Sequence, residues 1–355
     1  MTLPLILVGG FLGAGKTSLL LAAAQKLAAR GQRVGLVTND QGDQLVDTAL
    51  LEHHQLPVVE VAGGCFCCRY PDLLRALTTL QQRVAPDVIL AEPVGSCTDL
   101  HATVIRPLQR QPDSPFRIAP LSITYDPLRT PRRFAAEVDY LFQRQLAEAE
   151  FVVLTKQDLA DARAASQAAA SQARHSGAEQ IFALSSATGE GVDSWLDAVL
   201  TSTSRTDRQM EIDYATYAAG EAALGWLNAS GTLSAQQPFS PYNWTNALLR
   251  MLESSLRERS CEIAHLKISA ETAAGLCKAS ITQSHGPVSW DSSPTKQPTT
   301  TLTFLLNARV QSPPTTLESV VRRVFDELTP SPDFHCQFTQ FECFSPLPPT
   351  PTYRI

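Results

Sequence analysis

Along the first 200 residues, short apolar runs alternate with stretches that repeat apolar residues at helical spacing. The runs are nearly continuous, which is typical of strands whose two faces are both covered by helices. This alternation predicts an α/β fold, a mostly parallel sheet flanked by helices and joined by right-handed crossovers. The expected strands are 3–8, 33–38, 58–61, 88–91, 117–124, 151–155 and 181–185, and the expected helices are 16–30, 72–84, 132–149, 161–175 and 192–200.

The remaining residues follow a different pattern. A polar linker near residue 201 leads into a stretch rich in helical spacing, and from about residue 260 β-rich segments return around one helical segment, 317–328. We therefore expect a larger α/β domain and a smaller α+β C-terminal domain, and the Pro-rich tail is expected to be extended or disordered. The expected boundaries are 1–205 for the first domain, 206–259 for a helical connector, 260–344 for the second domain and 345–355 for the tail.

Composition narrows the class of protein. Of 355 residues 44% are hydrophobic and 18% charged, which argues against a disordered chain, and the net charge of −6 gives no electrostatic signal for nucleic acid or an anionic membrane. The apolar run at the N-terminus is too short to span a bilayer and lacks the features of a leader. Eight cysteines in a chain of this size suggest thiol chemistry in a reducing compartment. We expect a cytoplasmic protein.

The first motif with clear chemistry is GFLGAGKT at residues 10–17, a full match to G-x(4)-G-K-[ST] between an expected strand and an expected helix. Its backbone N–H groups can cradle phosphates at the positive end of the helix dipole. Lys16 is expected to contact the β- and γ-phosphates, and the Thr17 hydroxyl to coordinate Mg²⁺. The alternative is an incidental glycine-rich turn. The expected nucleotide-binding residues here are Gly10, Gly13, Ala14, Gly15, Lys16, Thr17 and Ser18.

Two later segments favour a guanine base. Thr155-Lys156-Gln157-Asp158 resembles the N-K-x-D box of GTPases, with Thr in place of Asn, and the Asp158 carboxylate could accept the two guanine donors that adenine does not offer. The segment Ser185-Ser186-Ala187 resembles the loop whose backbone contacts guanine O6. Asp158 could also be a simple helix N-cap. Together the two segments make GTP the expected nucleotide.

Acidic residues follow two further strands, where side chains near the γ-phosphate are expected. Asp40 and Asp43 follow the second strand, and Glu92 follows the fourth, where it could orient the Mg²⁺ shell or the attacking water. The N–H of Gly95 could sense the γ-phosphate. Ordinary turn chemistry is the alternative for both loops. Lys16 and Glu92 are the expected catalytic residues.

Three of the eight cysteines crowd into Gly63-Gly64-Cys65-Phe66-Cys67-Cys68. In an extended segment Cys65 and Cys67 point the same way and Cys68 the opposite way, so Cys68 becomes a third ligand only if the chain turns. Two or three thiolates leave a tetrahedral Zn²⁺ or Co²⁺ site open, as suits a metal that is passed on, and Asp40 or Asp43 could complete it. The alternative is that these are small buried hydrophobic residues. The scattered cysteines at 97, 261, 277, 336 and 343 are expected to fill space.

In this order the motifs G-x(4)-G-K-T, N-D-x-G-D, G-G-C-x-C-C, E-x-x-G and T-K-x-D resemble those of the CobW-type metallochaperone GTPases, over about residues 5–190. The resemblance implies a Mg²⁺-dependent GTPase that binds Zn, Co or Ni at Cys65, Cys67 and Cys68 and delivers it to a client protein. Nucleotide state would control metal binding, and a homodimer is possible. Two departures are the Pro that follows Glu92, where Ser or Thr is usual, and the lack of a histidine-rich tract.

Other functions remain open at this point. A P-loop kinase would need an acceptor lid and no guanine box. A nucleotide-gated binding protein would carry the same loops without metal cargo. A redox role for Cys67 and Cys68 is the weakest, because neighbouring cysteines form strained disulfides. The metal favoured by thiolates is Zn²⁺ or Co²⁺, and the client is not identified by the sequence.

Overall fold

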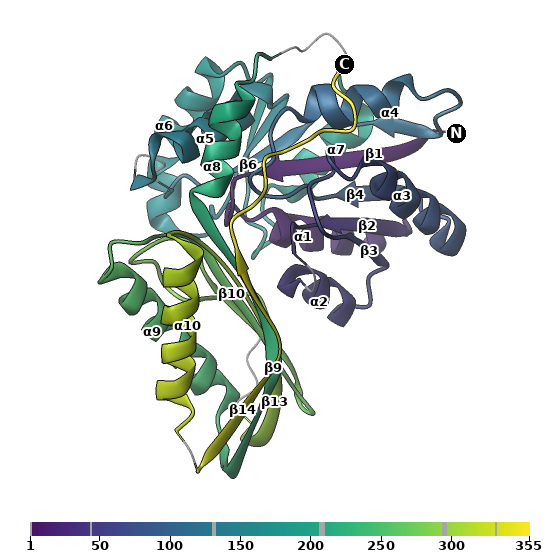
Figure 1. Cartoon of the computed structure of the whole chain (residues 1–355). Helices are drawn as coiled ribbons and strands as arrows, with labels where there is room; N and C mark the ends of the chain where they lie inside the picture. The colour runs from purple at the N-terminus through teal and green to yellow at the C-terminus, as the bar shows by residue number, and fades with distance from the viewer. Residues whose placement is uncertain (1, 43–44, 130–132, 206–209, 293–296, 331) are drawn as a thin grey trace. The chain divides into compact units, whose positions relative to one another are not determined.

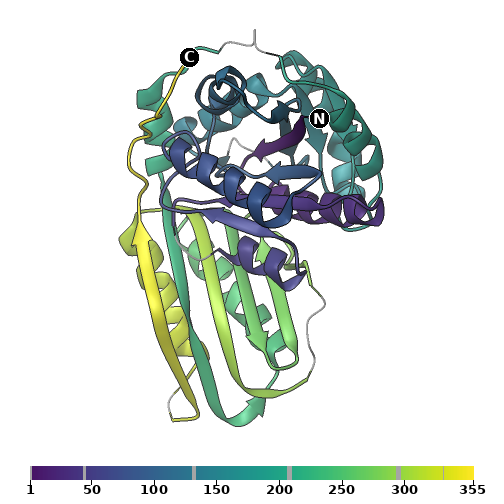
Figure 2. The same ribbon diagram turned by 90° about the vertical axis from the view of Figure 1, so that its right-hand side faces the viewer.

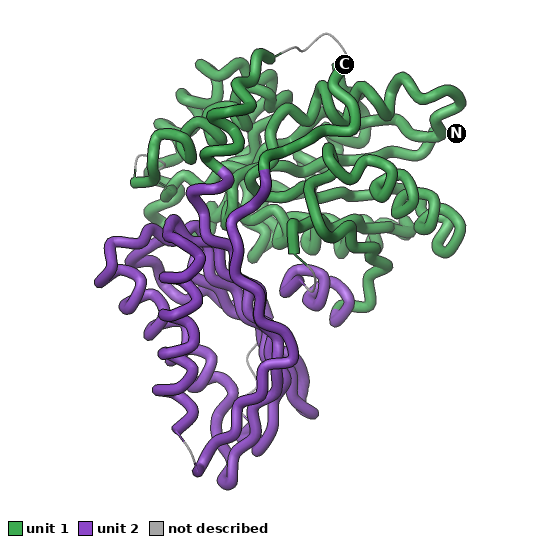
Figure 3. The backbone as a smooth tube through the Cα atoms, in the orientation of Figure 1, with its two compact units in different colours: residues 1–42, 54–220, 348–355 green, residues 43–53, 221–347 purple. Residues whose placement is uncertain are grey.

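The computed structural model describes residues 2–42, 45–129, 133–205, 210–292, 297–330 and 332–355. By its internal contacts the chain forms two compact units (Figure 3). Unit 1 consists of residues 1–42, 54–220 and 348–355, and unit 2 of residues 43–53 and 221–347. Both units are therefore discontinuous in sequence, unlike the consecutive domains that the sequence suggested. No helix in the described ranges has both the length and the apolar character that a membrane crossing requires.

Unit 1 contains a parallel sheet in the order β3-β2-β4-β1-β6-β7-β8, with β5 paired to β1 (Figure 1). The strands β1, β2, β4, β6 and β7 are mostly buried, and helices lie on both faces, so the expected α/β class is confirmed. The strands are β1 (Leu3–Gly10), β2 (Val34–Asn39), β3 (Val58–Val61), β4 (Val88–Ala91), β5 (Phe116–Ile118), β6 (Ser122–Tyr125), β7 (Phe151–Leu154) and β8 (Gln180–Ala183). The helices are α1 (Lys16–Ala29), α3 (Tyr70–Val84), the π-helix η1 (His101–Ile105), α4 (Arg106–Arg110), α5 (Ala136–Glu148), α6 (Ala160–His175), α7 (Val192–Thr201) and α8 (Tyr214–Ala222).

One expected strand of unit 1 is divided. The segment 117–124 forms the separate strands β5 and β6, with Pro120 between them. Proline has no N–H to give to the ladder, so a continuous strand is disfavoured there. Both pieces pair with β1, one after the other along its length.

Unit 2 is an antiparallel sheet in the order β12-β11-β10-β13-β9-β14, whose long strands lie side by side in Figure 2. Helices α9 and α10 pack on one face, and the core between them contains Trp244, Phe304 and Phe325. The elements are β9 (Leu224–Phe239), α9 (Pro241–Arg257), β10 (Glu262–Thr272), β11 (Gly275–Ile281), β12 (Ser289–Trp290), β13 (Thr299–Gln311), α10 (Pro314–Leu328) and β14 (Phe334–Phe344).

The prediction of a helical connector at 206–259 is wrong for residues 224–239. This segment contains β9, a strand of 16 residues that pairs with β13 on one side and β14 on the other. The strand includes Gly225, Gly231 and several other residues of weak β-propensity, so little in its local sequence marks it. Pairing with two distant strands supplies the stability that local propensity does not.

Helix α2 (Val46–His53) belongs to unit 2, although it lies early in the sequence. Along β10, Leu266 and Ile268 face the core beneath α9, so Lys267 between them faces the opposite side of the sheet. There the Lys267 ammonium lies 2.5 Å and that of Lys278 lies 3.0 Å from the Asp47 carboxylate. Burial alone would raise the pKa of Asp47, but the two lysines hold it well below its ordinary value. Asp43, an expected metal ligand, lies outside the described residues.

The last residues, 348–355, return to unit 1 and are called the strap below. This segment has no helix or strand, in agreement with an extended tail. It is not disordered, however, because its backbone and side chains form hydrogen bonds with unit 1. Prolines in the strap favour the extended backbone that such docking needs.

Candidate nucleotide site and cysteine cluster

The phosphate loop connects β1 to α1. Gly10 ends the strand with φ 129°, and a Cβ there would lie 2.5 Å from the Thr124 carbonyl oxygen, so only glycine fits. Gly15 precedes the helix in the left-handed conformation, φ 92°, and no side chain caps the helix. Because Gly15 has no side chain, it cannot cap the N–H groups of the first helical turn, which includes Ser18. A strand, a glycine-rich turn and an uncapped helix start form an anion site.

Lys16 and Thr17 both reach Glu92, which follows β4. The Thr17 hydroxyl donates to the two carboxylate oxygens at 2.9 and 3.1 Å, and the Lys16 ammonium lies 3.8 Å from one of them. All three side chains are buried. A hydroxyl and a carboxylate are the hard oxygen donors that Mg²⁺ prefers, so this pair of residues fits a magnesium ion.

Gly95 lies directly against the phosphate loop. A Cβ at this position would lie 2.9 Å from Lys16 Nζ and 2.8 Å from a Leu12 methyl group. The amide of Gln145 on α5 donates to the carbonyl oxygens of both Gly95 and Cys97, at 3.0 and 2.9 Å. Gln145 fixes this loop, and no sequence motif marks it.

The segment after β7 is tied to the phosphate loop. The Thr155 hydroxyl donates to the Ala14 carbonyl at 2.9 Å, and Lys156 has a positive φ of 60°. The Lys156 ammonium lies 2.7 Å from the carboxylate of Asp126, which follows β6. This ion pair leaves the aliphatic stem of Lys156 as the part that can cover a base.

Asp158 and the segment after β8 meet. The Ser185 hydroxyl donates to Asp158 Oδ1 at 2.6 Å, and Asp158 is exposed. The Ser186 Oγ atom is buried and has no hydrogen-bond partner among the described residues, while Ala187 is exposed. The two segments expected to read a base therefore lie side by side, with a carboxylate and an unsatisfied hydroxyl.

Asn39, at the end of β2, holds three segments together. Its amide N–H₂ donates to the carbonyl oxygens of Val61 and Gly64 at 2.8 and 2.7 Å. Its Oδ1 accepts from the N–H of Phe66 at 2.9 Å and of Val94 at 3.3 Å. One buried amide thus joins the cysteine loop to the loop after Glu92. The N-D-x-G-D motif contains Asn39, but its role was not expected from sequence.

Asp40, an expected metal ligand, uses its side chain locally. Its Oδ1 accepts from the N–H of Gln41 at 2.6 Å and of Gly42 at 3.4 Å. Its backbone N–H and C=O bond to Val61 and Gly64 on the cysteine side. Its metal role therefore remains a prediction.

The three cysteines converge, and Cys68 is among them. Residues 65–69 form a turn in which the N–H groups of Cys68 and Arg69 donate to the Cys65 carbonyl at 3.0 and 2.9 Å. The chain turns here, which was the stated condition for Cys68 to join the other two cysteines, and the turn brings all three sulfurs together. The distances are 2.7 Å for Cys65–Cys67, 3.2 Å for Cys65–Cys68 and 3.7 Å for Cys67–Cys68. Among the described residues these three thiols form the group able to hold a metal ion.

Because the three sulfurs lie close together, the pKa of Cys65 is shifted in the opposite direction to those of Cys67 and Cys68. Hydrogen bonds from Cys67 and Cys68 stabilise the Cys65 thiolate and hold the pKa of Cys65 well below its usual value. The same contact with Cys65 raises the pKa of Cys67 well above its usual value and that of Cys68 to about 11. Without a metal, the cluster therefore favours one thiolate that two thiols stabilise.

A fourth cysteine reaches the cluster. Cys97 was expected only to fill space, but its thiol interacts with those of Cys65 and Cys67 and contributes to the shifts of their pKa values. It is 1% exposed and follows Gly95 by two residues. The other distant cysteines agree with the expectation: Cys261 and Cys277 are buried in the core of unit 2, and Cys336 and Cys343 pack against it.

The strap runs beside the cysteine turn. The Thr350 N–H donates to Cys68 Sγ at 3.2 Å, and the Thr352 N–H donates to the Cys67 carbonyl at 2.8 Å. The Thr352 hydroxyl donates to the Cys68 carbonyl at 3.2 Å. Nothing in the sequence indicates that residues so far apart meet.

Curated relatives match a little under half of the chain. It is 29% identical over 191 residues to the zinc chaperone CobW of a Sinorhizobium species, covering 45% of this chain and 52% of that protein. It is 31% identical over 201 residues to the zinc chaperone CobW of Pseudomonas aeruginosa, covering 46% of this chain and 51% of that protein. The chain thus spans about half the length of the curated relatives that it matches.

Among solved structures, a Zn(II)-bound YjiA GTPase from E. coli aligns with 92% of this chain and 99% of its own, at 15% identity and a TM-score of 0.35. That score is too low to bear on the fold. The family model for the CobW/HypB/UreG nucleotide-binding domain matches residues 4–183, which include the phosphate loop, the cysteine turn and the segment 155–158. The chain belongs to the CobW/HypB/UreG family of P-loop proteins.

Proposed function

We propose that this protein is a Mg²⁺-dependent GTPase that binds a transition-metal ion at Cys65, Cys67 and Cys68 and delivers it to a client protein. The observation that carries the proposal is the convergence of three sulfurs in one turn. In a tetrahedral thiolate site with Zn–S bonds of about 2.3 Å, neighbouring sulfurs lie about 3.8 Å apart, so the observed cluster needs to open only slightly. Zn²⁺ and Co²⁺ suit it best, and Ni²⁺ is a further candidate.

Asn39 supports control of the metal by the nucleotide. It accepts from Val94, two residues after Glu92, and from Phe66, between the cysteines. Glu92 in turn bonds Thr17 and Lys16. A change at the phosphates that moves Glu92 would reach the cysteine turn through this one amide, which is a short physical path.

The phosphate-side residues have distinct roles in the proposal. The phosphate loop N–H groups and Lys16 bind and orient the β- and γ-phosphates. Thr17 and Glu92 would hold Mg²⁺, and the bound ion would supply neutralisation of the charge on the phosphate oxygens. Glu92 also orients the attacking water. Asp158, with Ser185 and Ser186 beside it, reads the guanine edge, and Lys156 covers the base.

The test is the affinity for Zn²⁺, measured anaerobically by competition with a chromophoric chelator, with a non-hydrolysable GTP analogue and with GDP. We expect tighter binding with the analogue, and one Zn²⁺ per chain. Cys65→Ser and Cys67→Ser should each weaken binding by about 100-fold, because each removes one of few thiolate ligands. Cys277→Ser, buried in unit 2, is the matched control and should bind like the wild type. Equal affinities in the two nucleotide states would end the proposed coupling.

Two rival functions predict other results. A nucleotide-gated binding protein without cargo would contain no metal after anaerobic purification and would not respond to Cys65→Ser. A P-loop kinase would transfer phosphate to a small acceptor and would accept ATP as readily as GTP. The contact between Ser185 and Asp158 favours the GTPase. The proposed location is the cytoplasm, where cysteines are kept reduced and available to a metal ion.

A further inference from the structure

The strongest unassigned group in the molecule is the thiol of Cys97. It is buried, lies outside the C-x-C-C motif, and interacts with Cys65 and Cys67. The Cys97 N–H donates to the carbonyl of Val94, whose own N–H shares the Asn39 acceptor with Phe66 of the cysteine turn, so the two segments are neighbours. Three sulfurs from one turn leave a tetrahedral ion short of a ligand. Cys97 is not among the three sulfurs that lie within 4.8 Å of one another, so it would complete the shell only by moving closer to them. Cys97 comes from a different segment, the loop after Glu92.

That loop is held rigidly. The Cys97 N–H donates to the Val94 carbonyl at 2.9 Å, and Gln145 bonds the carbonyl oxygens of Gly95 and Cys97 together. Positions 95 and 97 therefore move as one body. At position 95 the backbone lies against Leu12 and Lys16 of the phosphate loop, where a Cβ would not fit.

We propose that Cys97 is a further sulfur ligand of the metal ion and that Gly95 links its position to the nucleotide. The proposal rests on the metal-binding function above and adds a residue to it. If the nucleotide shifts the loop, Cys97 approaches or leaves the ion while Cys65 and Cys67 stay bound. The number of sulfur ligands then differs between nucleotide states, and with it the readiness of the ion to leave.

The test uses Co²⁺, whose sulfur-to-metal charge-transfer absorption grows with the number of bound thiolates. With the GTP analogue, Cys97→Ser should reduce this absorption by about a quarter, as expected for loss of one of four thiolates. Cys277→Ser should leave it unchanged. Cys97→Ala serves as a second variant, and near-ultraviolet circular dichroism verifies that each variant is folded.

The outcomes separate the two proposals. Full absorption in both Cys97 variants, together with its loss in Cys65→Ser, would overturn the role of Cys97 and leave the metal site standing. Absence of Co²⁺ binding by the wild-type chain would overturn both. Reduced absorption in the Cys97 variants under one nucleotide and not the other would support the link through Gly95.

A second feature is carried by separate contacts. Besides its bonds to Cys67 and Cys68, the strap stacks Tyr353 edge-on against Tyr70, with ring centroids 5.2 Å apart. The Arg354 guanidinium lies 2.8 Å from the buried Asp99 carboxylate. The strap is therefore fastened at both ends of its path, although its side chains are largely exposed.

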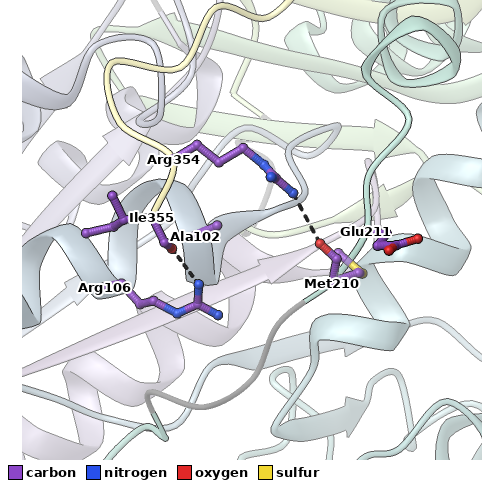
Figure 4. A pocket seen from close by; sticks show the side chains of 6 residues that line it. All are labelled: Ala102, Arg106, Met210, Glu211, Arg354 and Ile355. Carbon is purple, nitrogen blue, oxygen red and sulfur yellow. Dashed lines mark hydrogen bonds between the residues drawn. The ribbon is translucent and has the colours of Figure 1, made fainter.

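The end of the strap also forms one wall of a cavity of about 420 Å³ in unit 1. Figure 4 shows Arg354 bonded to the Met210 carbonyl, and Arg106 bonded to the Ile355 carbonyl on the other side. The six residues that line this cavity are Ala102, Arg106, Met210, Glu211, Arg354 and Ile355. A wall that borders open space is easier to lift than a segment packed on all sides.

We infer that the strap is a lid over Cys68 that lifts before metal enters or leaves. Its covering of Cys68 can be tested without metal, whereas its role in metal exchange rests on the proposed function. The measurement is the rate of alkylation of Cys68 by iodoacetamide in the metal-free full chain, resolved by peptide mass spectrometry. Tyr353→Ala combined with Arg354→Ala should raise the rate about tenfold, which corresponds to about 1.4 kcal/mol of easier opening.

Leu347→Ala is the matched control, because Leu347 is 83% exposed and next to the strap. Its rate should equal that of the wild type. Thr352→Pro, which removes the N–H bonded to Cys67, is an independent variant and should also accelerate alkylation. Unchanged rates in both test variants would overturn the lid. With Zn²⁺ bound, the same variants should release the ion faster to a chelator. Release rates equal to that of the wild type would mean that the strap covers Cys68 but does not control metal exchange.

Discussion

In the proposed function the phosphate loop binds the phosphates of the nucleotide and the cysteine turn binds a metal ion, yet the two sites are built in different ways. The phosphate loop is contiguous: strand, glycines and helix follow one another, and the backbone itself supplies the site. The cysteine turn depends on Asn39, Cys97 and the strap, which come from distant positions. A local site is robust to changes elsewhere, whereas an assembled site can respond to them. This difference is what a nucleotide-controlled metal site requires.

The largest expected effect comes from breaking the local site. Lys16→Ala should weaken binding of a fluorescent GTP analogue by at least about 100-fold, because a charge-assisted contact to the phosphates is lost. In the absence of nucleotide, Zn²⁺ affinity should stay near the wild-type value. Arg30→Ala, at the other end of α1 and paired with Asp193 at the surface, is the control and should bind nucleotide normally. A large loss of nucleotide-free metal binding in Lys16→Ala would mean that the two sites are not distinct.

A smaller effect is expected when Asn39, which connects the cysteine turn to the loop after Glu92, is replaced. Asn39→Ala leaves buried N–H groups of Phe66 and Val94 without their acceptor, at a cost of about 2 kcal/mol in unfolding free energy. Zn²⁺ affinity should fall about tenfold, and the difference between GTP-analogue and GDP states should vanish. Denaturant unfolding and chelator competition measure the two effects.

The matched control for Asn39 is a buried asparagine of unit 2. Asn228 accepts from the Asn307 amide at 3.0 Å and is far in sequence from both sites. Asn228→Ala should lower stability by a similar amount but preserve metal affinity and its response to nucleotide. A loss of that response in Asn228→Ala would show that general destabilisation, rather than loss of the Asn39 hydrogen bonds, explains the result for Asn39→Ala.

The smallest effect on the two sites is expected at Glu148, which binds the backbone next to Asp99, the partner of strap residue Arg354. Burial, with the nearby Asp99 charge, raises the pKa of Glu148 to about 8, although its carboxylate accepts the Leu100 N–H at 2.7 Å. The folded protein thus keeps a proton that the unfolded chain releases near its ordinary value, so stability falls as pH rises from about 5 to about 8. Glu148→Gln cannot lose that proton. Relative to the wild type, the variant should gain about 2.5 kcal/mol between pH 6 and 8.5, measured by thermal unfolding.

Parallel stability curves for Glu148→Gln and the wild type over this range would contradict a buried, protonated carboxyl. Tyr125→Phe offers a comparison, because its hydroxyl bonds Gln172 away from the strap and ionises only at higher pH. It should change stability equally at both pH values.

The sequence predicts the local site well and the assembled site only in part. The spacing of Gly10, Gly15 and Lys16 leaves few ways to fold, so strand, loop and helix lie where expected. The cysteine motif marks the proposed metal site, but the shape of that site depends on a turn at residues 65–69 that an alternating pattern does not reveal. Cys97 and Thr350 meet the cluster through tertiary packing, for which no spacing rule exists. Strand β9 was missed for the same reason, since its partners are distant in the chain.

The distance in sequence between the cysteine turn and the strap has a consequence for biosynthesis. Cys68 and Thr350 are 282 residues apart. At about 5 to 20 residues per second, a ribosome makes Cys68 about 15 to 55 seconds before it makes the residue that bonds to its sulfur. A nascent chain therefore presents its thiols uncovered for most of translation, and the covered cluster exists only once synthesis has reached the strap.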